Sequence, residues 1–85
     1  MKSKLYINNG DKEWRLPGGD LHREDGPAVE WNNGRKEWWI NGKRHRVGGP
    51  AYIMDRYKVW YIDGVKCEKK DYNKKLRLYK LKHIL

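Results

Sequence analysis

The sequence predicts a mainly β protein of the α+β class. We expect an antiparallel meander of β-hairpins, built from repeats of about 23 residues, followed by a basic amphipathic helix at the C-terminus. Three observations predict this fold: a block of residues recurs, Asn-Gly or Asp-Gly pairs separate short β-prone runs, and the last fifth of the chain lacks glycine and proline. We expect a single domain in this chain of 85 residues, with hairpin repeats over 1–66 and a basic helical tail over 67–85.

The repeat is visible by comparing the chain with itself. His22–Ala28 (HREDGPA) recurs 23 residues later as His45–Ala51 (HRVGGPA), and Trp38–Gly42 (WWING) recurs 22 residues later as Trp60–Gly64 (WYIDG). A partial copy of the unit precedes both. A repeat of this length is typical of stacked supersecondary units, each too small to be stable alone.

Turn chemistry predicts the hairpins. Asn-Gly and Asp-Gly accept positive φ at both central positions of a two-residue type I′ turn. These pairs are Asn9-Gly10, Asn33-Gly34, Asn41-Gly42 and Asp63-Gly64. The expected strands are Leu5–Ile7, Glu13–Leu16, Ala28–Trp31, Lys36–Ile40, Lys43–Arg46, Ala51–Met54, Val59–Ile62 and Val65–Cys67. Pro27 and Pro50 have no amide donor, so we expect each to begin a strand or to lie at an edge.

The tail has a different composition. Lys66–His83 carries eight basic and two acidic residues, a net charge of +6 out of +9 for the whole chain. Its apolar residues have helical spacing: Tyr72, Leu76 and Tyr79, with Leu78, Leu81 and Leu85 beside them. We expect a helix from about Tyr72 to Ile84, N-capped by Asp71, whose apolar stripe covers one face of the sheet or a second copy. Alternation over Leu76–Lys82 leaves a strand as the alternative there.

The His-Arg-x-x-Gly-Pro-Ala block, with its aromatic strand and Asn-Gly turn, resembles the short β-hairpin repeats of tailed-phage and giant-virus proteins. These repeats are similar in layout to MORN-type repeats, and the resemblance covers Ile7 to Val65. It implies a single elongated sheet. It also implies a small phage protein that inhibits a host defence factor, such as the ToxN-type ribonuclease of a toxin–antitoxin system, with RNA involved. The second copy departs from the first at Val47-Gly48, where the first has Glu24-Asp25.

Composition indicates which cellular compartment and which class of partner to expect. The chain has twenty basic and eleven acidic residues, and a protein with this net positive charge attracts polyanions. The lone Cys67 excludes an intramolecular disulfide, and no apolar run has the length of a signal peptide or a membrane span. We therefore expect a soluble cytoplasmic protein without a membrane partner, in the host cytoplasm if it is phage-encoded.

No pattern of catalytic residues stands out. His22-Arg23 and His45-Arg46 are duplicated at equivalent positions, which favours hydrogen bonds that shape the repeat corners; contact with a phosphate or base is the alternative. No Walker loop, dinucleotide fingerprint, nucleophile elbow or zinc-ligand spacing is present. The sequence therefore predicts a protein that is not an enzyme and holds no cofactor or metal.

RNA, or another nucleic acid, is the expected partner, because basic and aromatic residues are interleaved. The residues expected to contact phosphate are Arg35, Lys36, Lys43, Arg44, Arg46, Lys58, Lys69, Lys70, Lys74, Lys75, Arg77, Lys80 and Lys82. Trp39 and Tyr61 are the expected stacking residues. In each of the pairs Trp38-Trp39 and Trp60-Tyr61, we expect one ring in the core and the other covered by the tail, a subunit or a ligand.

Three alternatives stay open. The first is a protein-interaction or inhibitor module without nucleic-acid binding. The second is sequestration of a small anionic nucleotide. The third is a charge run that is only a solvated face. A homodimer is also expected, because a thin sheet leaves an aromatic face to cover.

Overall fold

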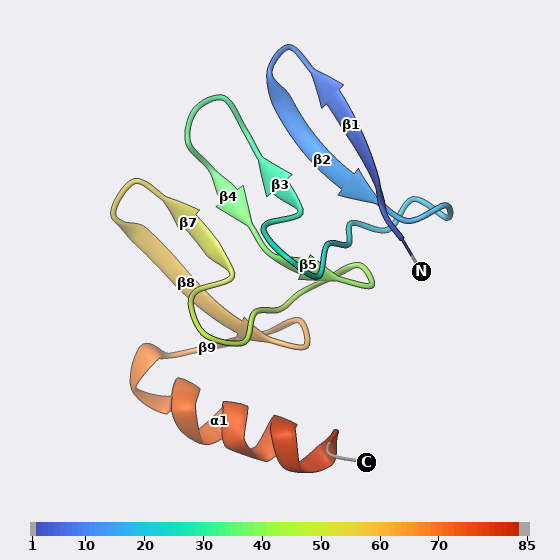
Figure 1. The fold of residues 1–85 in the computed structure, drawn as a ribbon. Helices are drawn as coiled ribbons and strands as arrows, with labels where there is room; N and C mark the ends of the chain where they lie inside the picture. The colour runs from blue at the N-terminus through green and yellow to red at the C-terminus, as the bar shows by residue number, and fades with distance from the viewer. Residues whose placement is uncertain (1, 84–85) are drawn as a thin grey trace.

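The computed structural model describes residues 2–83, which form a thin slab of 39 × 32 × 17 Å (Figure 1). Seven strands make one antiparallel sheet in the order β1-β2-β3-β4-β7-β8-β9, and β5 and β6 pair beside it. The strands are β1 Lys4–Asn8, β2 Asp11–Arg15, β3 Val29–Glu30, β4 Lys36–Glu37, β5 Trp39–Ile40, β6 Lys43–Arg44, β7 Tyr52–Met54, β8 Tyr57–Ile62 and β9 Val65–Cys67. One helix, α1 Lys69–Lys82, follows them. The predicted fold class is confirmed.

Each repeat contributes two hairpins, one before and one after its Trp. The hairpins β1–β2, β3–β4 and β7–β8 lie along one long edge of the slab, and the shorter turns after Arg15, β5 and β8 lie along the opposite edge (Figure 1). The expected continuous strand Lys36–Ile40 is wrong, because the chain passes from one hairpin to the other at Trp38. The Trp38 amide donates to the Ala51 carbonyl, and the Trp38 carbonyl accepts from the His45 amide.

The turns follow the predicted chemistry with one exception. Asn9-Gly10, Asn41-Gly42 and Asp63-Gly64 have positive φ at both residues, as type I′ turns require. At Asn33-Gly34 only the glycine does, at φ +94°. There the Gly34 amide donates to the Trp31 carbonyl at 2.9 Å, which closes a three-residue loop with a left-handed glycine at its end.

The helix begins earlier than predicted. It starts at Lys69, Glu68 occupies the N-cap position, and the predicted cap Asp71 lies within the first turn. This first turn places the Lys69 ammonium 5.7 Å from the centre of the Trp60 ring and buries Tyr72. Residues 69–82 are helical, so the strand alternative for the tail is wrong. Ile84 and Leu85, which the prediction included, lie outside the described residues.

The helix closes one end of the repeat stack and does not cover a face of the sheet, which corrects the prediction. Tyr72, 6% exposed, packs with Ile62 and Cys67, and Leu76 and Tyr79 flank this cluster. The Tyr72 hydroxyl accepts a hydrogen bond from the Gly48 amide at 2.9 Å and donates one to the Arg46 carbonyl at 2.6 Å. Leu78 and Leu81, 57% and 62% exposed, point away from the cluster. The helix therefore docks where the next repeat would stack (Figure 1).

The core is small. The buried apolar residues are Ala28, Val29, Ala51, Val59, Ile62, Cys67 and Tyr72. Trp38, Trp39, Trp60 and Tyr61 are all half-buried, so the prediction that one ring of each pair is core is wrong. A slab 17 Å thick has no second layer to enclose such rings, and they lie partly covered by neighbouring side chains instead.

Candidate nucleic-acid interface

The two His-Arg corners have the structural role that their duplication predicts. His22 Nδ1 accepts a hydrogen bond from the Asn41 amide at 2.9 Å, and His45 Nδ1 accepts one from the Asp63 amide at 2.9 Å. Because an N–H donates to Nδ1, each imidazole in this arrangement is neutral and carries its proton on Nε2. Burial lowers the pKa of His45, Asp63 opposes this change, and His83 adds to it.

A ladder of tryptophans runs along one side of the sheet, and a cation lies over each ring. The rungs are Arg23 on Trp14 (3.9 Å to the ring centre), Arg46 on Trp38 (3.9 Å) and Lys69 on Trp60 (5.7 Å). Strand register places Lys36 and Lys58 on this side, because both pair with Ile53, and Lys36 also pairs with Glu30, which bonds Arg23. We call this surface the ladder side: Trp14, Arg23, Glu30, Lys36, Trp38, Arg46, Ile53, Lys58, Trp60 and Lys69.

The opposite side of the sheet is organised around Glu37, which is only 3% exposed. Its carboxylate accepts hydrogen bonds from Trp39 Nε1 at 2.8 Å, Arg35 Nε at 2.7 Å and Arg44 Nη2 at 3.2 Å. Burial raises the pKa of Glu37, but the bonds from Trp39 and Arg35 and the charge of Arg44 outweigh it, so the pKa lies below its ordinary value.

Aromatic rings complete this second side. The Arg44 guanidinium lies 5.1 Å from the ring centre of Trp39, 5.3 Å from that of Tyr52 and 5.4 Å from that of Tyr61. Arg35 lies 4.3 Å from the ring centre of Trp31. We call this surface the Glu37 side: Trp31, Arg35, Glu37, Trp39, Arg44, Tyr52 and Tyr61. Its rings are half-buried, and its two guanidinium groups share one buried carboxylate.

Lysines and arginines are used differently. All thirteen lysines are exposed, and none of them forms a salt bridge within residues 2–83. Apart from the contact of His22 with Glu24, every salt bridge in that range has an arginine as its cation, and five of the seven arginines are half-buried. This division follows from the planar guanidinium, which stacks on rings and forks onto carboxylates, whereas the ammonium stays hydrated.

The predicted interface residues are therefore spread over several surfaces. Arg35, Arg44, Trp39 and Tyr61 lie together on the Glu37 side, and Lys36, Arg46, Lys58 and Lys69 on the ladder side. Lys70, Lys74, Lys75, Arg77, Lys80 and Lys82 are exposed on α1, and Lys43 lies in the short hairpin β5–β6. Sequence reasoning missed Glu37, although alternation along the expected strand Lys36–Ile40 would have placed Glu37 and Trp39 on one side.

Sequence reasoning also missed that Cys67 occupies the position at which the repeat would place a third corner histidine. Cys67 follows Asp63-Gly64 at the spacing at which His45 follows Asn41-Gly42, and it is buried as His45 is. Its Sγ lies 3.6 Å from the Trp60 carbonyl oxygen. Burial raises the pKa of this thiol, with Lys75 opposing and Asp71 and Glu68 adding to the change. The third unit thus ends in a thiol and a helix where a third His-Arg corner would stand.

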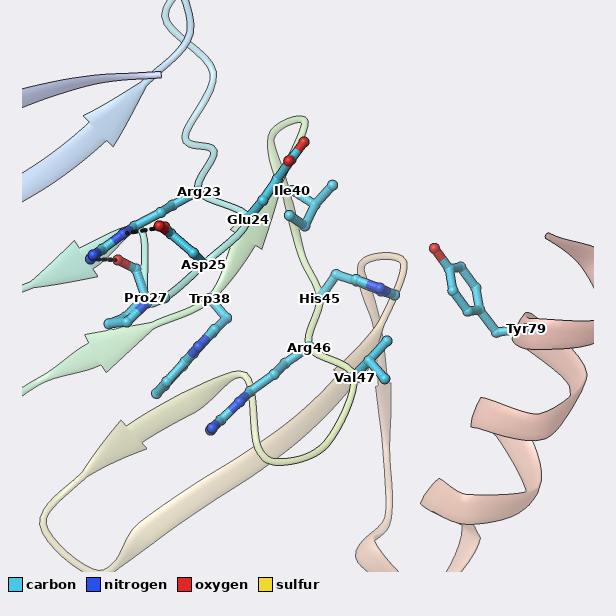
Figure 2. A pocket seen from close by; sticks show the side chains of 11 residues that line it. Arg23, Glu24, Asp25, Pro27, Trp38, Ile40, His45, Arg46, Val47 and Tyr79 are labelled. Atoms are coloured by element: carbon cyan, nitrogen blue, oxygen red, sulfur yellow. Dashed lines mark hydrogen bonds and ion pairs between the residues drawn. The ribbon is translucent and has the colours of Figure 1, made fainter. Parts of the chain in front are cut away.

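A groove separates the two corners. It encloses about 670 Å³, and its lining includes Trp38, Ile40, Arg46, Val47 and Tyr79 (Figure 2). Figure 2 shows Tyr79 reaching from α1 toward His45, and the ring centres of these two residues are 4.7 Å apart. Trp38 and Arg46 of the ladder side line this groove, which is open to solvent.

Within residues 2–83, no cluster of three or more His, Cys, Asp or Glu side chains is placed to bind a metal ion. Over the same range, no helix combines the length and apolar character needed to cross a bilayer.

Together, fold and surface define a stacked β-hairpin repeat protein with a helical cap and two chemically different sides. Comparison with protein-family models, curated proteins and solved structures found no match.

Proposed function

We propose that this protein binds RNA, or another nucleic acid, through its phosphate backbone. The observation that supports this best is the set of thirteen exposed lysines without acidic partners in the described chain. Phosphates release bound counterions when they meet such cations, which gives affinity without sequence preference. Trp39 and Tyr61 are half-buried, and the exposed parts of their rings offer surfaces on which unpaired bases stack; such stacking favours single strands.

Fluorescence anisotropy with a labelled single-stranded RNA, over a series of salt concentrations, tests the proposal. We expect binding at about 50 mM salt that weakens steeply as salt rises, because each neutralised phosphate adds to the salt dependence. Replacing Lys74, Lys75, Lys80 and Lys82 by glutamine should weaken binding about tenfold or more. The charge-matched control changes Lys2, Lys4, Lys12 and Arg56, remote from α1. No binding of the unmodified protein at low salt would overturn the proposal, and equal losses in both variants would show that α1 has no special part.

We also propose that the protein acts by occupancy, as an inhibitor of a host ribonuclease of the toxin–antitoxin class, in line with its resemblance to phage repeats. Adding the protein to such a ribonuclease should lower the rate of RNA cleavage. The RNA-binding variant on α1 should lose this inhibition if RNA takes part in it. Unchanged cleavage at saturating protein would overturn this extension and leave RNA binding to stand by itself.

The second candidate function is a protein-interaction module, which the Glu37 side favours. This side has half-buried Trp, Tyr and Arg side chains, the residue types that dominate protein interfaces. The variants Trp39→Ala and Tyr61→Ala separate the two candidates. If the Glu37 side docks a protein, they lose ribonuclease inhibition and keep RNA binding; if it stacks bases, they lose RNA binding.

We further propose that β1 mediates self-association. Within the described residues β1 and β9 are the two edges of the sheet, and α1 packs against β9. In β1, Leu5, Tyr6 and Ile7 are 40%, 49% and 62% exposed. Antiparallel pairing about Tyr6 would place Lys4 of one copy opposite Asn8 of the other, so no like charges meet. Light scattering should give the mass of a dimer, and Ile7→Lys should give that of one chain. A one-chain mass for the unmodified protein at high concentration would overturn this.

A further inference from the structure

The two His-Arg corners provide an internal comparison, because their arginines are held in the same way. Arg23 lies 3.9 Å from the ring centre of Trp14, and Arg46 lies 3.9 Å from that of Trp38. Nη1 of Arg23 donates to the Pro27 carbonyl at 3.1 Å, and Nη1 of Arg46 donates to the Pro50 carbonyl at 3.0 Å. Each guanidinium is thus fixed by one ring and one carbonyl.

The corners differ in their carboxylates. Arg23 Nε donates to Asp25 Oδ1 at 3.1 Å (Figure 2). Its Nη1 also donates to Glu30 Oε2 at 3.1 Å. The repeat places Gly48 at the position of Asp25 and Ile53 at that of Glu30. Arg46 consequently has no carboxylate partner in the part of the chain that the structure describes.

The surroundings of Arg46 suit an anion from outside the chain. A Cβ built on Gly48 would have no atom within 4 Å, so the approach on this side is open. Arg46 lines the groove of about 670 Å³ described above. The neighbouring cations Lys36, Lys58 and Lys69 on the ladder side are exposed and unpaired within residues 2–83. A charged donor that is held rigidly loses little entropy when it binds an oxyanion.

We propose that Arg46 is an oxyanion site. It binds a phosphodiester oxygen of RNA at the position that is equivalent, in the first corner, to that of the Asp25 carboxylate on Arg23. The assignment to RNA rests on the proposed function. A polyanion is favoured over a single acidic side chain because Arg46 and Lys69 lie on rungs two strands apart, about 10 Å, so that separate phosphates of one RNA strand reach the two cations. Arg23, whose charge its own carboxylates neutralise, takes no part.

An NMR titration tests the oxyanion site without RNA. The Nε–Hε resonances of Arg46 and Arg23 are followed as inorganic phosphate is added, with acetate in a parallel titration. Phosphate should shift the Arg46 resonance saturably and leave that of Arg23 in place. Equal shifts of both, or no shift of Arg46, would overturn the site. A response to acetate at lower concentration than to phosphate would overturn the preference for phosphate and point to an acidic protein partner.

Matched variants test the RNA assignment by anisotropy. Arg46→Gln should weaken RNA binding about fivefold to tenfold and lower the salt slope by about 0.7, the value of one phosphate contact on a single strand. Arg46→Lys keeps the charge but loses the planar fork, so a loss of about threefold is expected. Ile53→Glu gives Arg46 a carboxylate at the position equivalent to Glu30, which pairs with Arg23. Its loss in RNA binding should match that of Arg46→Gln.

The charge-matched control for the RNA test is Arg56→Gln, an exposed turn residue. Thermal unfolding of each variant confirms that it folds, and Arg46→Lys, the mildest change, decides the outcome should another variant not fold. Losses no larger than that of Arg56→Gln would overturn the assignment to RNA. If the unmodified protein binds no RNA and phosphate still shifts Arg46, the proposed function fails and the oxyanion site stands.

Discussion

The two sides of this sheet have similar cations and use them in different ways. On the Glu37 side, Arg35 and Arg44 converge on one buried carboxylate, which neutralises part of their charge within the fold. On the ladder side, the second and third rungs hold Arg46 and Lys69 without carboxylates in the described chain. Net charge alone therefore does not show which surface attracts a polyanion. The distribution of carboxylates among the arginines does.

The comparison also explains how a protein with so little apolar core is held together. Each of the five tryptophans has a cation over its ring: four have an arginine and Trp60 has a lysine. A guanidinium on a ring covers apolar surface and adds a cation–π attraction of about 0.5–1 kcal/mol at exposed sites. The arginine side chains thus supply the cover that a second layer provides in a larger domain.

The largest expected change in the free energy of unfolding comes from removing the central carboxylate of the Glu37 side. Glu37→Gln leaves the guanidinium groups of Arg35 and Arg44 without their carboxylate, and we expect a loss of about 2 kcal/mol in the free energy of unfolding, measured by urea denaturation. The matched control is Glu13→Gln, whose carboxylate is more exposed and pairs with Arg15 alone; it should cost less than about 1 kcal/mol. Equal losses for the two variants would contradict a special role for Glu37.

The next effect separates guanidinium from charge. Arg44→Lys keeps the positive charge near Glu37 but loses the planar contact with Trp39, Tyr52 and Tyr61, and should cost about 1 kcal/mol. The reverse change on the ladder side, Lys58→Arg, should leave the free energy of unfolding within about 0.5 kcal/mol. Comparable losses in both would mean that neither side distinguishes the two cations.

Acidification should act on the His45 corner and on the Glu37 side in different pH windows. The pKa of His45 is lowered by burial, so its contribution to stability is complete above pH 6.5 and is lost as pH falls below that value, when protonation removes the acceptor for the Asp63 amide. The pKa of Glu37 is also lowered, so its contribution is complete above pH 4.5 and disappears only as pH falls through the folded value. NMR titration of His45 and urea midpoints of the unmodified protein and Glu37→Gln follow the two steps. A His45 pKa above 6.5 would contradict the first.

The smallest effect on stability is expected for the exposed lysines of the ladder side, whose replacement should instead weaken RNA binding. Lys36→Gln and Lys58→Gln should each change the free energy of unfolding by less than about 0.5 kcal/mol, because neither ammonium is paired within residues 2–83. Each should lower the salt slope of RNA binding by about 0.7. A larger loss of stability with unchanged RNA binding would assign these lysines to the fold.

Local patterns determined most of the fold in advance. Asn9-Gly10, Asn41-Gly42 and Asp63-Gly64 predicted their turns, because positive φ at two successive residues is a local property of those side chains. The duplication of His22 and His45 predicted repeated corners, because the same residues at the same spacing form the same hydrogen bonds. The spacing of Tyr72, Leu76 and Tyr79 predicted which helix residues pack inward.

Three features were decided only by the tertiary structure. The helix closes the end of the stack because Tyr72 finds the Gly48 amide and the Arg46 carbonyl there, two groups 24 and 26 residues away in sequence. The partners of Glu37 include Arg44, which a different hairpin brings to it. The thin slab leaves Trp38 and Trp39 half-buried, because no second layer forms over either ring.

Surface charge divides in the same way between what the sequence determines and what the tertiary structure decides. The sequence by itself established the excess of positive charge, its concentration beyond Val65, and the replacement of Glu24-Asp25 by Val47-Gly48. Only the three-dimensional arrangement showed which cations the fold neutralises, since ion pairing depends on distances between side chains that register and stacking bring together. That arrangement separates structural arginines from exposed lysines, and it distinguishes Arg46 from Arg23 although both stand in the same repeat motif.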